Sequence, residues 1–231
     1  MKVCVVTGAD SGIGKAVASK LLEKGNKVYC AGGPSGSPFE NKNGEAVWLT
    51  LDFRIDADIK KVAEAVKEQA VDVLVNAAGI AFYGLAETVK PDDISAMADV
   101  NVKAPIMITS MLMPKLKRAK GAVINISSVT ALSSASPHGA AYGATKAALT
   151  SFGRSLFEET RKHGVRVTNI HPDLTDTNLY RNADFTVTGD PESTLFSDDI
   201  AKYCEIVLGE REGMCVEELT LRPQKNMIVK K

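Results

Sequence analysis

Short apolar runs alternate with longer amphipathic stretches along most of the chain. Short apolar runs bounded by turn residues are typical of buried strands, and apolar residues three or four positions apart are typical of helices. The pattern predicts strands over residues 2–6, 27–31, 46–51, 71–75, 122–127, 165–170 and 215–221. It predicts helices over residues 12–24, 56–69, 91–118 (as two segments), 142–163 and 197–208.

This alternation indicates a parallel sheet, because right-handed crossovers place helices on either face of it. We therefore expect an α/β fold of the Rossmann type, a doubly wound parallel sheet of about seven strands with helices on both faces. The 231 residues contain no low-complexity linker and no internal repeat beyond this alternation, so we expect a single domain over residues 1–231. Residues 172–198 are expected to be irregular, and no helix is expected over residues 32–44.

Composition excludes several classes of partner. The 28 basic and 28 acidic residues cancel, which leaves no overall charge to attract nucleic acid or a membrane surface. No apolar run approaches the length of about eighteen residues that suggests a membrane span, and the N-terminal run is too short for a signal peptide, so we expect a cytoplasmic protein. The four cysteines show no C-x-x-C spacing and are expected to be buried thiols. We expect no metal site, and a solvated C-terminal tail over residues 225–231.

A glycine-rich turn joins the first predicted strand to the first predicted helix and reads TGADSGIG from Thr7 to Gly14. Glycines at such a turn let the backbone approach a pyrophosphate, whose charge the helix N-terminus attracts. The first two glycines are three residues apart, unlike G-x-G-x-x-G, and a tight turn without a ligand is the alternative. The candidate dinucleotide-binding residues of this turn are Gly8, Asp10, Ser11, Gly12, Ile13 and Gly14.

Two further motifs stand at predicted strand ends, where ligands of open parallel sheets bind. Asp52 and Phe53 close the third strand in LTLDF, and the carboxylate is placed to accept a hydrogen bond from an adenine amino group; a helix cap is the alternative. Residues 76–79 read NAAG, small residues that let a flat cofactor lie against the backbone; close packing of a helix on a strand is the alternative. Asn76, Ala77 and Gly79 are the candidate contacts there.

The stretch from Ile124 to Lys146 reads INISSVTALSSASPHGAAYGATK and carries the candidate chemistry. In a helix, Tyr142 and Lys146 lie four residues apart on one face. An adjacent cation favours the phenolate and would lower the tyrosine pKa, and a serine hydroxyl would hold a carbonyl oxygen against the phenol. Ser127 and Ser128 both precede the loop, and a tyrosine–lysine pair at this spacing also arises by chance.

These motifs together resemble the short-chain dehydrogenase/reductase family. TGADSGIG, NAAG, DVNVKAP, NISS and YGATK occur in the family's order and at nearly its spacing, over essentially the whole chain. The resemblance implies an NAD(P)-dependent oxidoreductase with a tetrad of Asn101, Ser128, Tyr142 and Lys146. In that scheme Tyr142 gives a proton to the carbonyl oxygen as hydride arrives from the nicotinamide, and Ser128 holds that oxygen. Lys146 lowers the tyrosine pKa and binds the nicotinamide ribose, while Asn101 supports a water that relays protons. A helix-kinking or helix-capping amide is the alternative for Asn101.

Three departures from the family's pattern affect the expected site. The segment from Ser128 to Tyr142 is one residue longer than is usual in the family, and Pro172-Asp173 replaces the usual Pro-Gly. Thr175 and Thr177 are the candidates to hold the nicotinamide carboxamide. The helix usually found between the second and third strands is missing.

The end of the second predicted strand bears on the choice of cofactor. An acidic residue there pairs with the ribose hydroxyls of NAD, and a basic one accommodates the phosphate of NADP. Gly32 and Gly33 occupy this position, and Ser11 stands where a basic residue would precede Gly12. With no carboxylate at the strand end, and with Ser35 and Ser37 as possible phosphate donors, NADP is favoured over NAD.

The substrate region is expected over residues 129–139 and 174–196. Its moderately apolar side chains suit a small or medium carbonyl compound: Leu132, His138, Leu179, Tyr180, Phe185 and Phe196. His138 is expected at the surface and His171 packed at a strand end. The resemblance implies a homodimer or homotetramer associating through residues 104–118 and 140–163. A dinucleotide-binding sensor without turnover, and a lyase or epimerase on the same fold, are the alternative functions.

Overall fold

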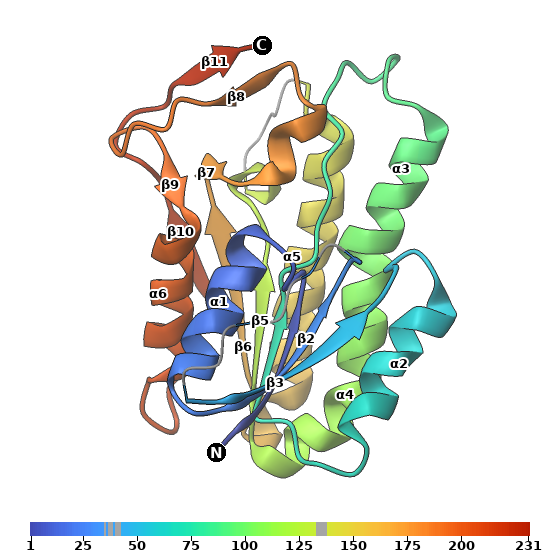
Figure 1. Ribbon diagram of the computed structural model, residues 1–231, viewed down its shortest axis with the longest axis vertical. Coiled ribbons are helices and arrows are strands. Elements are labelled where there is room, and N and C mark those ends of the chain that lie inside the picture. The colour runs from blue at the N-terminus through green and yellow to red at the C-terminus, as the bar shows by residue number, and fades with distance from the viewer. Residues whose placement is uncertain (35, 37–38, 40–42, 133–137) are drawn as a thin grey trace.

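The computed structural model describes residues 1–34, 36, 39, 43–132 and 138–231, and its centre is a seven-stranded parallel sheet (Figure 1). The strand order is β10-β6-β5-β4-β1-β2-β3, which confirms the predicted α/β fold class. The strands are β1 (Val3–Thr7), β2 (Lys27–Gly32), β3 (Glu45–Thr50), β4 (Val73–Asn76), β5 (Ala122–Ile126), β6 (Arg166–Pro172) and β10 (Glu218–Leu221).

Helices cover both faces of the sheet. They are α1 (Gly12–Glu23), α2 (Asp56–Val66), α3 (Pro91–Ala98), α4 (Ala104–Ala119), α5 (Ala140–Thr160) and α6 (Ser197–Leu208). The helices α1 and α6, which Figure 1 shows side by side, bury Val17 and Ile200 in one apolar cluster. The helices α2, α4 and α5 bury Ile59, Leu112 and Leu156 in the other. Each such side chain contributes roughly 1.5–3 kcal/mol when fully buried, so the spacing of apolar residues determines which helix face packs on the sheet.

The strand register brings the carboxyl ends of the central strands to one edge. Thr7 of β1 pairs with Asn76 of β4, Asn76 with Asn125 of β5, and Asn125 with Asn169 of β6. The loops that follow these strands therefore start at the same level. The predicted cofactor and catalytic motifs, far apart in sequence, lie in or near these loops.

A π-helical turn, Asp99–Lys103, separates α3 from α4 in the region predicted as two helical segments over residues 91–118. Such a turn inserts one extra residue and is frequent at functional sites. The sequence predicts two segments here but not the type of the interruption. Among the described residues between β2 and β3 none is helical, in agreement with the absence of a helix pattern there.

Two small sheets lie outside the predictions. β11 (Ile228–Lys230) pairs antiparallel with β8 (Phe185–Val187), and β7 (Thr175–Asp176) pairs with β9 (Leu195–Phe196). Residues 228–230 are thus not an unpaired tail, although their side chains are exposed. The reason is that β8 offers a free edge to the β-branched pair Ile228–Val229. The region expected to be irregular contains three short strands and a 3-10 helix, Asn178–Asn182.

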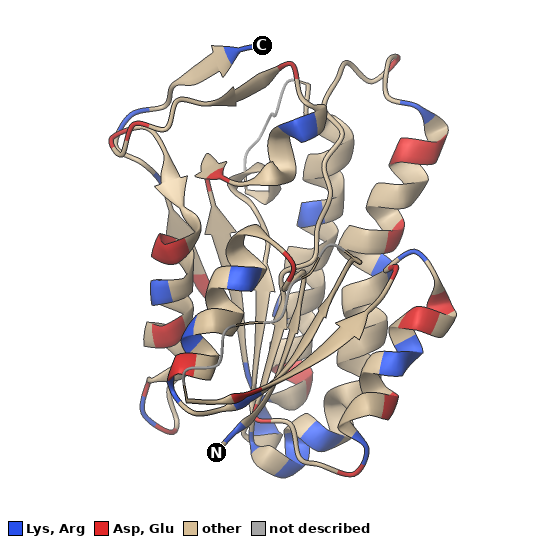
Figure 2. Ribbon diagram, viewed as in Figure 1, with Lys and Arg blue, Asp and Glu red and all other residues tan. Residues whose placement is uncertain are grey.

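Charges of both signs are interspersed over the helices, as the alternating red and blue segments of α2 and α6 show (Figure 2). In the described part of the chain, no helix combines the length and hydrophobicity needed to cross a membrane. The same residues contain no group of histidine, cysteine and carboxylate side chains that is suited to a metal ion. All four cysteines are free thiols, and three of them are buried: Cys4, Cys30 and Cys204.

Candidate active site

The glycine-rich turn follows β1 and begins α1, and it packs tightly against the loop after β4. Gly8 has a φ of +68°, and a Cβ on it would lie 2.8 Å from the backbone of Ala78. A Cβ on Gly14 would lie 2.2 Å from the oxygen of Gly8. The Thr7 hydroxyl accepts hydrogen bonds from the backbone of Ala77 and Ala78, at 3.1 Å each. Only glycine fits at these two positions, so the motif is first of all a requirement of the backbone.

A cavity of about 1000 Å³ extends from this turn to Tyr142. It is also lined by Arg54, Tyr83 and Ile228, none of which the sequence motifs indicate. The structure brings most of the predicted site residues to its wall: Gly8, Asp10, Ser11, Gly12, Ile13, Gly14, Gly33, Asp52, Phe53, Ala77, Gly79, Ser128, Tyr142, Lys146, Thr175 and Thr177. Gly32, Asn76 and Asn101 lie outside the lining.

Asn76 lies inside the sheet layer and not at the cavity. Its Nδ2 donates to Asn125 Oδ1 at 2.9 Å and to Thr109 Oγ1 at 3.1 Å. Asn125 in turn donates to Asn169 Oδ1 at 3.0 Å. Because three aligned strands place an asparagine at the same register, these side chains hydrogen-bond to one another as a buried ladder, although Asn76 Oδ1 has no partner among the described residues. The side chain of Asn76 thus supports the sheet, and its contact with a cofactor stays a prediction.

The end of β2 is occupied by the carboxylate of Asp10. A Cβ on Gly32 would lie only 2.5 Å from Asp10 Oδ1, and one on Gly33 would lie 3.9 Å from Oδ2. The end of β2 carries no acidic residue of its own, but the Asp10 carboxylate reaches the same place from the glycine turn. Ser35 and Ser37, the predicted phosphate donors, lie outside the described residues.

Asp52 forms a two-pronged ion pair with Arg54. Arg54 Nε donates to Oδ1 at 2.9 Å, and Nη2 donates to Oδ2 at 2.6 Å. These hydrogen bonds lower the pKa of Asp52. The alternative of a cap is not realised, since the N-cap of α2 is Ile55. The carboxylate that the sequence assigns to adenine is already paired, and the guanidinium of Arg54 is a cation that the sequence analysis missed.

Asn101 projects from the π-helical turn onto the backbone after NAAG. Its Oδ1 accepts from Ile80 N at 2.9 Å, and its Nδ2 donates to Ile80 O at 2.8 Å and to Thr145 Oγ1 at 3.0 Å. A Cβ on Gly79 would lie 3.5 Å from Asn101 Oδ1 and 3.3 Å from Lys146 Nζ. Asn101 Oδ1 and Lys146 Nζ therefore both border the space that a side chain on Gly79 would fill.

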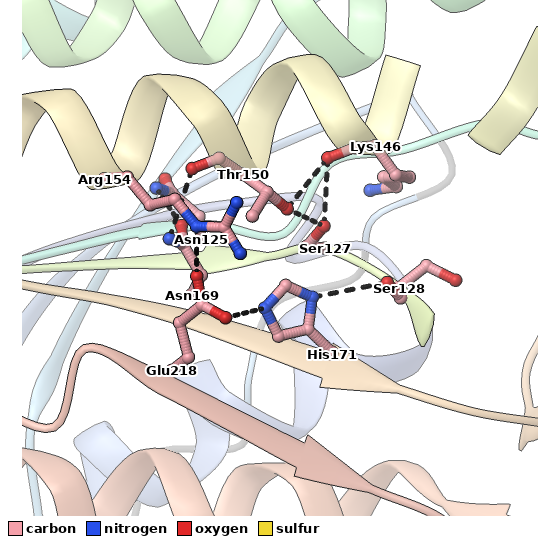
Figure 3. Close-up of polar contacts among 9 residues, drawn as sticks. All are labelled: Asn125, Ser127, Ser128, Lys146, Thr150, Arg154, Asn169, His171 and Glu218. Atoms are coloured by element: carbon pink, nitrogen blue, oxygen red, sulfur yellow. Dashed lines mark hydrogen bonds and ion pairs between the residues drawn. The ribbon is translucent and has the colours of Figure 1, made fainter. Parts of the chain in front are cut away.

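The two serines after β5 face different partners (Figure 3). The Ser127 hydroxyl lies 2.7 Å from Thr150 Oγ1 and donates to the Lys146 backbone oxygen at 3.1 Å. The Ser128 hydroxyl accepts from Thr130 N at 3.2 Å and lies close enough to the Tyr142 hydroxyl to lower the pKa of the phenol. The geometry thus places Ser128, and not Ser127, beside the phenol. Residues 133–137 of the longer loop lie outside the described part.

Tyr142 and Lys146 are both buried on one face of α5. Lys146 Nζ lies 5.9 Å from the Tyr142 ring centre and donates to Ile126 O at 2.8 Å. Burial lowers the pKa of Lys146 to about 8. Burial raises the pKa of Tyr142, the proximity of Tyr180 adds to the rise, and the Ser128 hydroxyl opposes it. The expected lowering of the tyrosine pKa by Lys146 is not seen, because burial of the phenol is the largest cause of the shift and Lys146 is not among its causes.

The turn after β6 is closed around Asp173. Its Oδ1 accepts from Leu174 N at 2.9 Å, and its backbone nitrogen donates to Leu221 O at 2.9 Å. Asp173 is not among the described residues with a positive φ, so the turn does not require the glycine that is usual here. Thr175 and Thr177 follow at the cavity wall, and Thr177 approaches Gly12 so closely that a Cβ there would lie 3.0 Å from its methyl group.

Aromatic rings surround the far end of the cavity. The Tyr83 ring centre lies 5.6 Å from that of Tyr142, 6.1 Å from that of Tyr180 and 5.1 Å from that of Phe185. Leu174, Leu179 and Ile228 complete this end. Three predicted substrate residues lie outside this wall: Leu132, the exposed His138, and Phe196. Phe196 lines an adjoining cavity of about 750 Å³. Tyr83 was missed because its segment carries no periodic pattern; its aromatic neighbour Phe82 was the available signal.

Comparison with known proteins identifies the family. The family model described as short chain dehydrogenase matches residues 2–186. An uncharacterized oxidoreductase of Staphylococcus epidermidis is 31% identical over 228 residues, which cover 96% of this chain and 97% of that protein. An uncharacterized oxidoreductase of Staphylococcus saprophyticus is 32% identical over 235 residues, with the same coverage.

Solved structures agree with this match. A metagenomic short-chain oxidoreductase in complex with NADP shares 30% identity at a TM-score of 0.77, over 96% of this chain and 97% of that chain. The closed form of a serine dehydrogenase complexed with NADP+ shares the fold at a TM-score of 0.83 and 24% identity, over 96% and 94% of the two chains. The chain therefore belongs to the short chain dehydrogenase family of oxidoreductases.

Proposed function

We propose that this protein transfers hydride between NADP(H) and a carbonyl/secondary alcohol pair, with Tyr142 as the general acid and base. The observation that carries the proposal is the meeting of Tyr142 with Ser128 and Lys146 at one end of a cavity whose other end is the glycine turn. A single carbonyl oxygen can accept hydrogen bonds from both hydroxyls at this place. The third group, Lys146, supplies a positive charge within the same pocket.

The cavity fits a dinucleotide. Its wall is built from the glycine turn at the N-terminus of α1, where a pyrophosphate is favoured. Gly79 leaves open the space in front of Lys146 Nζ and Asn101 Oδ1, which a Cβ would fill. Lys146 and Tyr142 would hold the nicotinamide ribose, and Thr175 and Thr177 the carboxamide. When bound, the nicotinamide supplies or accepts the hydride.

The protonation states suit reduction at neutral pH. Burial raises the pKa of Tyr142, so the phenol keeps its proton and can donate it to a carbonyl oxygen held by Ser128. Lys146, with a pKa of about 8, is mostly charged at neutral pH and stabilises the phenolate that remains after proton transfer. Alcohol oxidation requires the deprotonated phenol and is therefore expected to accelerate as the pH rises.

The choice of NADP rests on the metagenomic relative described in complex with NADP, and the carboxylate of Asp10 at the end of β2 acts against it. Titration of the protein fluorescence with NADPH and with NADH tests it directly. We expect the lower Kd for NADPH; equal or tighter binding of NADH would contradict the preference but not the reaction.

The aromatic end of the cavity supports a carbonyl compound with a flat apolar substituent as the substrate class. Tyr83, Tyr180 and Phe185 offer ring faces and edges within about 6 Å of one another. An aryl ketone is expected to react with a lower KM than a hydroxy acid of similar size. Replacing Phe185 with Ala is expected to raise the KM for the aryl ketone and to leave that for a small aliphatic ketone nearly unchanged.

Substitution of Tyr142 by Phe tests the reaction itself. The rate of NADPH oxidation with a carbonyl panel is expected to fall at least about 100-fold, the usual contribution of a general acid, while the Kd for NADPH stays close to that of the wild type. Tyr203→Phe, at a half-exposed tyrosine of α6, is the matched control. Full turnover in Tyr142→Phe contradicts its assigned role.

A dinucleotide-binding sensor is the competing function. It predicts tight NADPH binding by the wild type and no oxidation with any carbonyl of the panel. Association of two or four copies through α4 and α5 remains a prediction of the family resemblance, and light scattering that gives the mass of one chain would reject it.

A further inference from the structure

A chain of three side chains leads from the surface to the backbone of Ser128 (Figure 3). Arg154 on α5 donates from Nε to Oε1 of Glu218 on β10, at 2.5 Å. The other carboxylate oxygen of Glu218 lies 3.6 Å from Nε2 of His171 on β6. The opposite ring nitrogen, Nδ1, lies 3.3 Å from the backbone oxygen of Ser128. His171 thus joins the edge strand of the sheet to the serine beside Tyr142.

These contacts define the tautomer of His171. A carbonyl oxygen only accepts hydrogen bonds, so Nδ1 must carry a proton to bind Ser128. The side chain is fully buried, and this burial lowers the pKa of His171. At neutral pH the ring is therefore neutral, with its hydrogen on Nδ1. Among the described residues Nε2 has no hydrogen-bond partner, and the charged groups that face the ring are Glu218 and, behind it, Arg154.

His171 acts where the backbone ladder between β5 and β6 stops. The last backbone hydrogen bond joins Ser127 N to Ile170 O, at 2.7 Å. One residue further on, the Ser128 oxygen is bound by the imidazole of His171 and by the backbone nitrogen of Ala131, at 3.0 Å. The side chain of His171 thus extends the pairing of the two strands by one residue. That residue is the one whose hydroxyl meets Tyr142.

We propose that His171 is a positioning residue of the active site, which holds the Ser128 carbonyl so that the Ser128 hydroxyl stays against Tyr142. The inference rests on the proposed function. His171 does not reach the cavity wall itself, since the Ser128 backbone stands between them. Its effect is therefore on the geometry of the hydroxyl pair and not on cofactor affinity.

Two substitutions separate positioning from simple packing. His171→Asn keeps an N–H donor close to the place of Nδ1, whereas His171→Leu keeps the volume and removes the donor. We expect His171→Leu to lower kcat about tenfold, with the Kd for NADPH unchanged, and His171→Asn to restore most of the rate. Glu218→Leu is expected to leave kcat nearly unchanged, because an unprotonated Nε2 cannot donate to its carboxylate. His163→Asn and Glu158→Leu, at exposed positions of the same two residue types, are the matched controls.

A measurement without turnover tests the contact itself. The backbone amides of Thr130 and Ala131 donate to Ser128, at Oγ and at the carbonyl oxygen. Their hydrogen exchange is expected to accelerate in His171→Leu and to be nearly normal in His171→Asn, while the amide of Gly143 in α5 is unaffected. Unchanged exchange and kcat in His171→Leu, or equal defects in the Leu and Asn variants, would overturn the proposal. A wild type that reduces no carbonyl would reject the proposed function, and the exchange rates would still decide whether His171 fixes Ser128.

Discussion

Lys146 donates a hydrogen bond from its buried ammonium group to the backbone oxygen of Ile126, at the end of the strand that leads to Ser128. Only 4% of this lysine is exposed. Burying a charge costs free energy even when it keeps one hydrogen bond, and the low pKa of Lys146 reflects this cost. The buried charge of Lys146 therefore lowers the free energy of unfolding of the protein.

Replacement of Lys146 by Met should stabilise the fold and abolish activity. The free energy of unfolding is expected to rise by about 2 kcal/mol at neutral pH, because the apolar side chain fills the same space without a charge. Urea denaturation measures the gain, and NADPH oxidation the loss. Lys202→Met, on the exposed face of α6, controls for the change in net charge; a destabilised Lys146→Met protein would show that the ammonium contributes more than it costs.

The pH dependence of this gain has a defined sign. The pKa of Lys146 is lowered to about 8 in the folded protein, from an ordinary value of 10.5. Between these values the unfolded chain binds more protons, so the stability of the wild type rises with pH. The advantage of Lys146→Met over the wild type should therefore shrink from about pH 8 to about pH 10. Parallel unfolding curves at each pH measure it, and a constant difference would contradict the shift.

Asp10 is expected to limit the affinity for NADP. Its carboxylate lies at the end of β2, where a side chain normally meets the adenosine ribose. Asp10→Ser removes a negative charge from this place and should tighten NADPH binding by about 1 kcal/mol, roughly fivefold. NADH serves as the control within the same variant, since it lacks the phosphate and should bind no more tightly. An equal gain for both dinucleotides would show that Asp10 acts on the turn and not on the phosphate.

Gly153 should tolerate no side chain, because α5 crosses the asparagine ladder there. A Cβ at this position would lie 2.1 Å from Asn169 Oδ1 and 2.8 Å from Asn125 Nδ2. Gly153→Ala is expected to lower the free energy of unfolding by about 2 kcal/mol through overpacking and broken hydrogen bonds. Gly209→Ala, where the nearest atoms would lie at 3.4 Å, is expected to have a far smaller effect. Similar losses in both variants would argue against the ladder as the cause.

Much of the fold was predictable because each strand and helix carries a strong local pattern. The alternation of buried strands such as β4 with amphipathic helices such as α2 indicates a parallel sheet without any tertiary information. The spacing of four residues between Tyr142 and Lys146 likewise predicts that they lie on the same face of a helix. Strand ends were less certain: β10 begins at Glu218, three residues after the predicted start at Cys215.

The remaining features depend on contacts between distant segments. The register of the strands decides whether a strand-end asparagine faces a cofactor or its neighbours. Asn125 and Asn169 stand at matching positions, so the side chain of Asn76 bonds within the sheet. The direction of the Tyr142 pKa shift depends on how completely the phenol is buried, which spacing does not reveal. The pairing of β11 with β8 joins segments about forty residues apart, and neither has a partner in its own vicinity.

The central position of β1 has a consequence for how the chain must fold. The sheet grows outward from this first strand in two directions, through β2 and β3 on one side and through β4, β5, β6 and β10 on the other. During synthesis one edge of Val3–Thr7 stays unpaired until β4 has emerged, and an unpaired apolar edge favours aggregation. Glu218 lies on β10, the strand of the sheet that is synthesised last. The hydrophobic layers around β1 can therefore assemble before β10 completes the sheet and brings Glu218 close to His171.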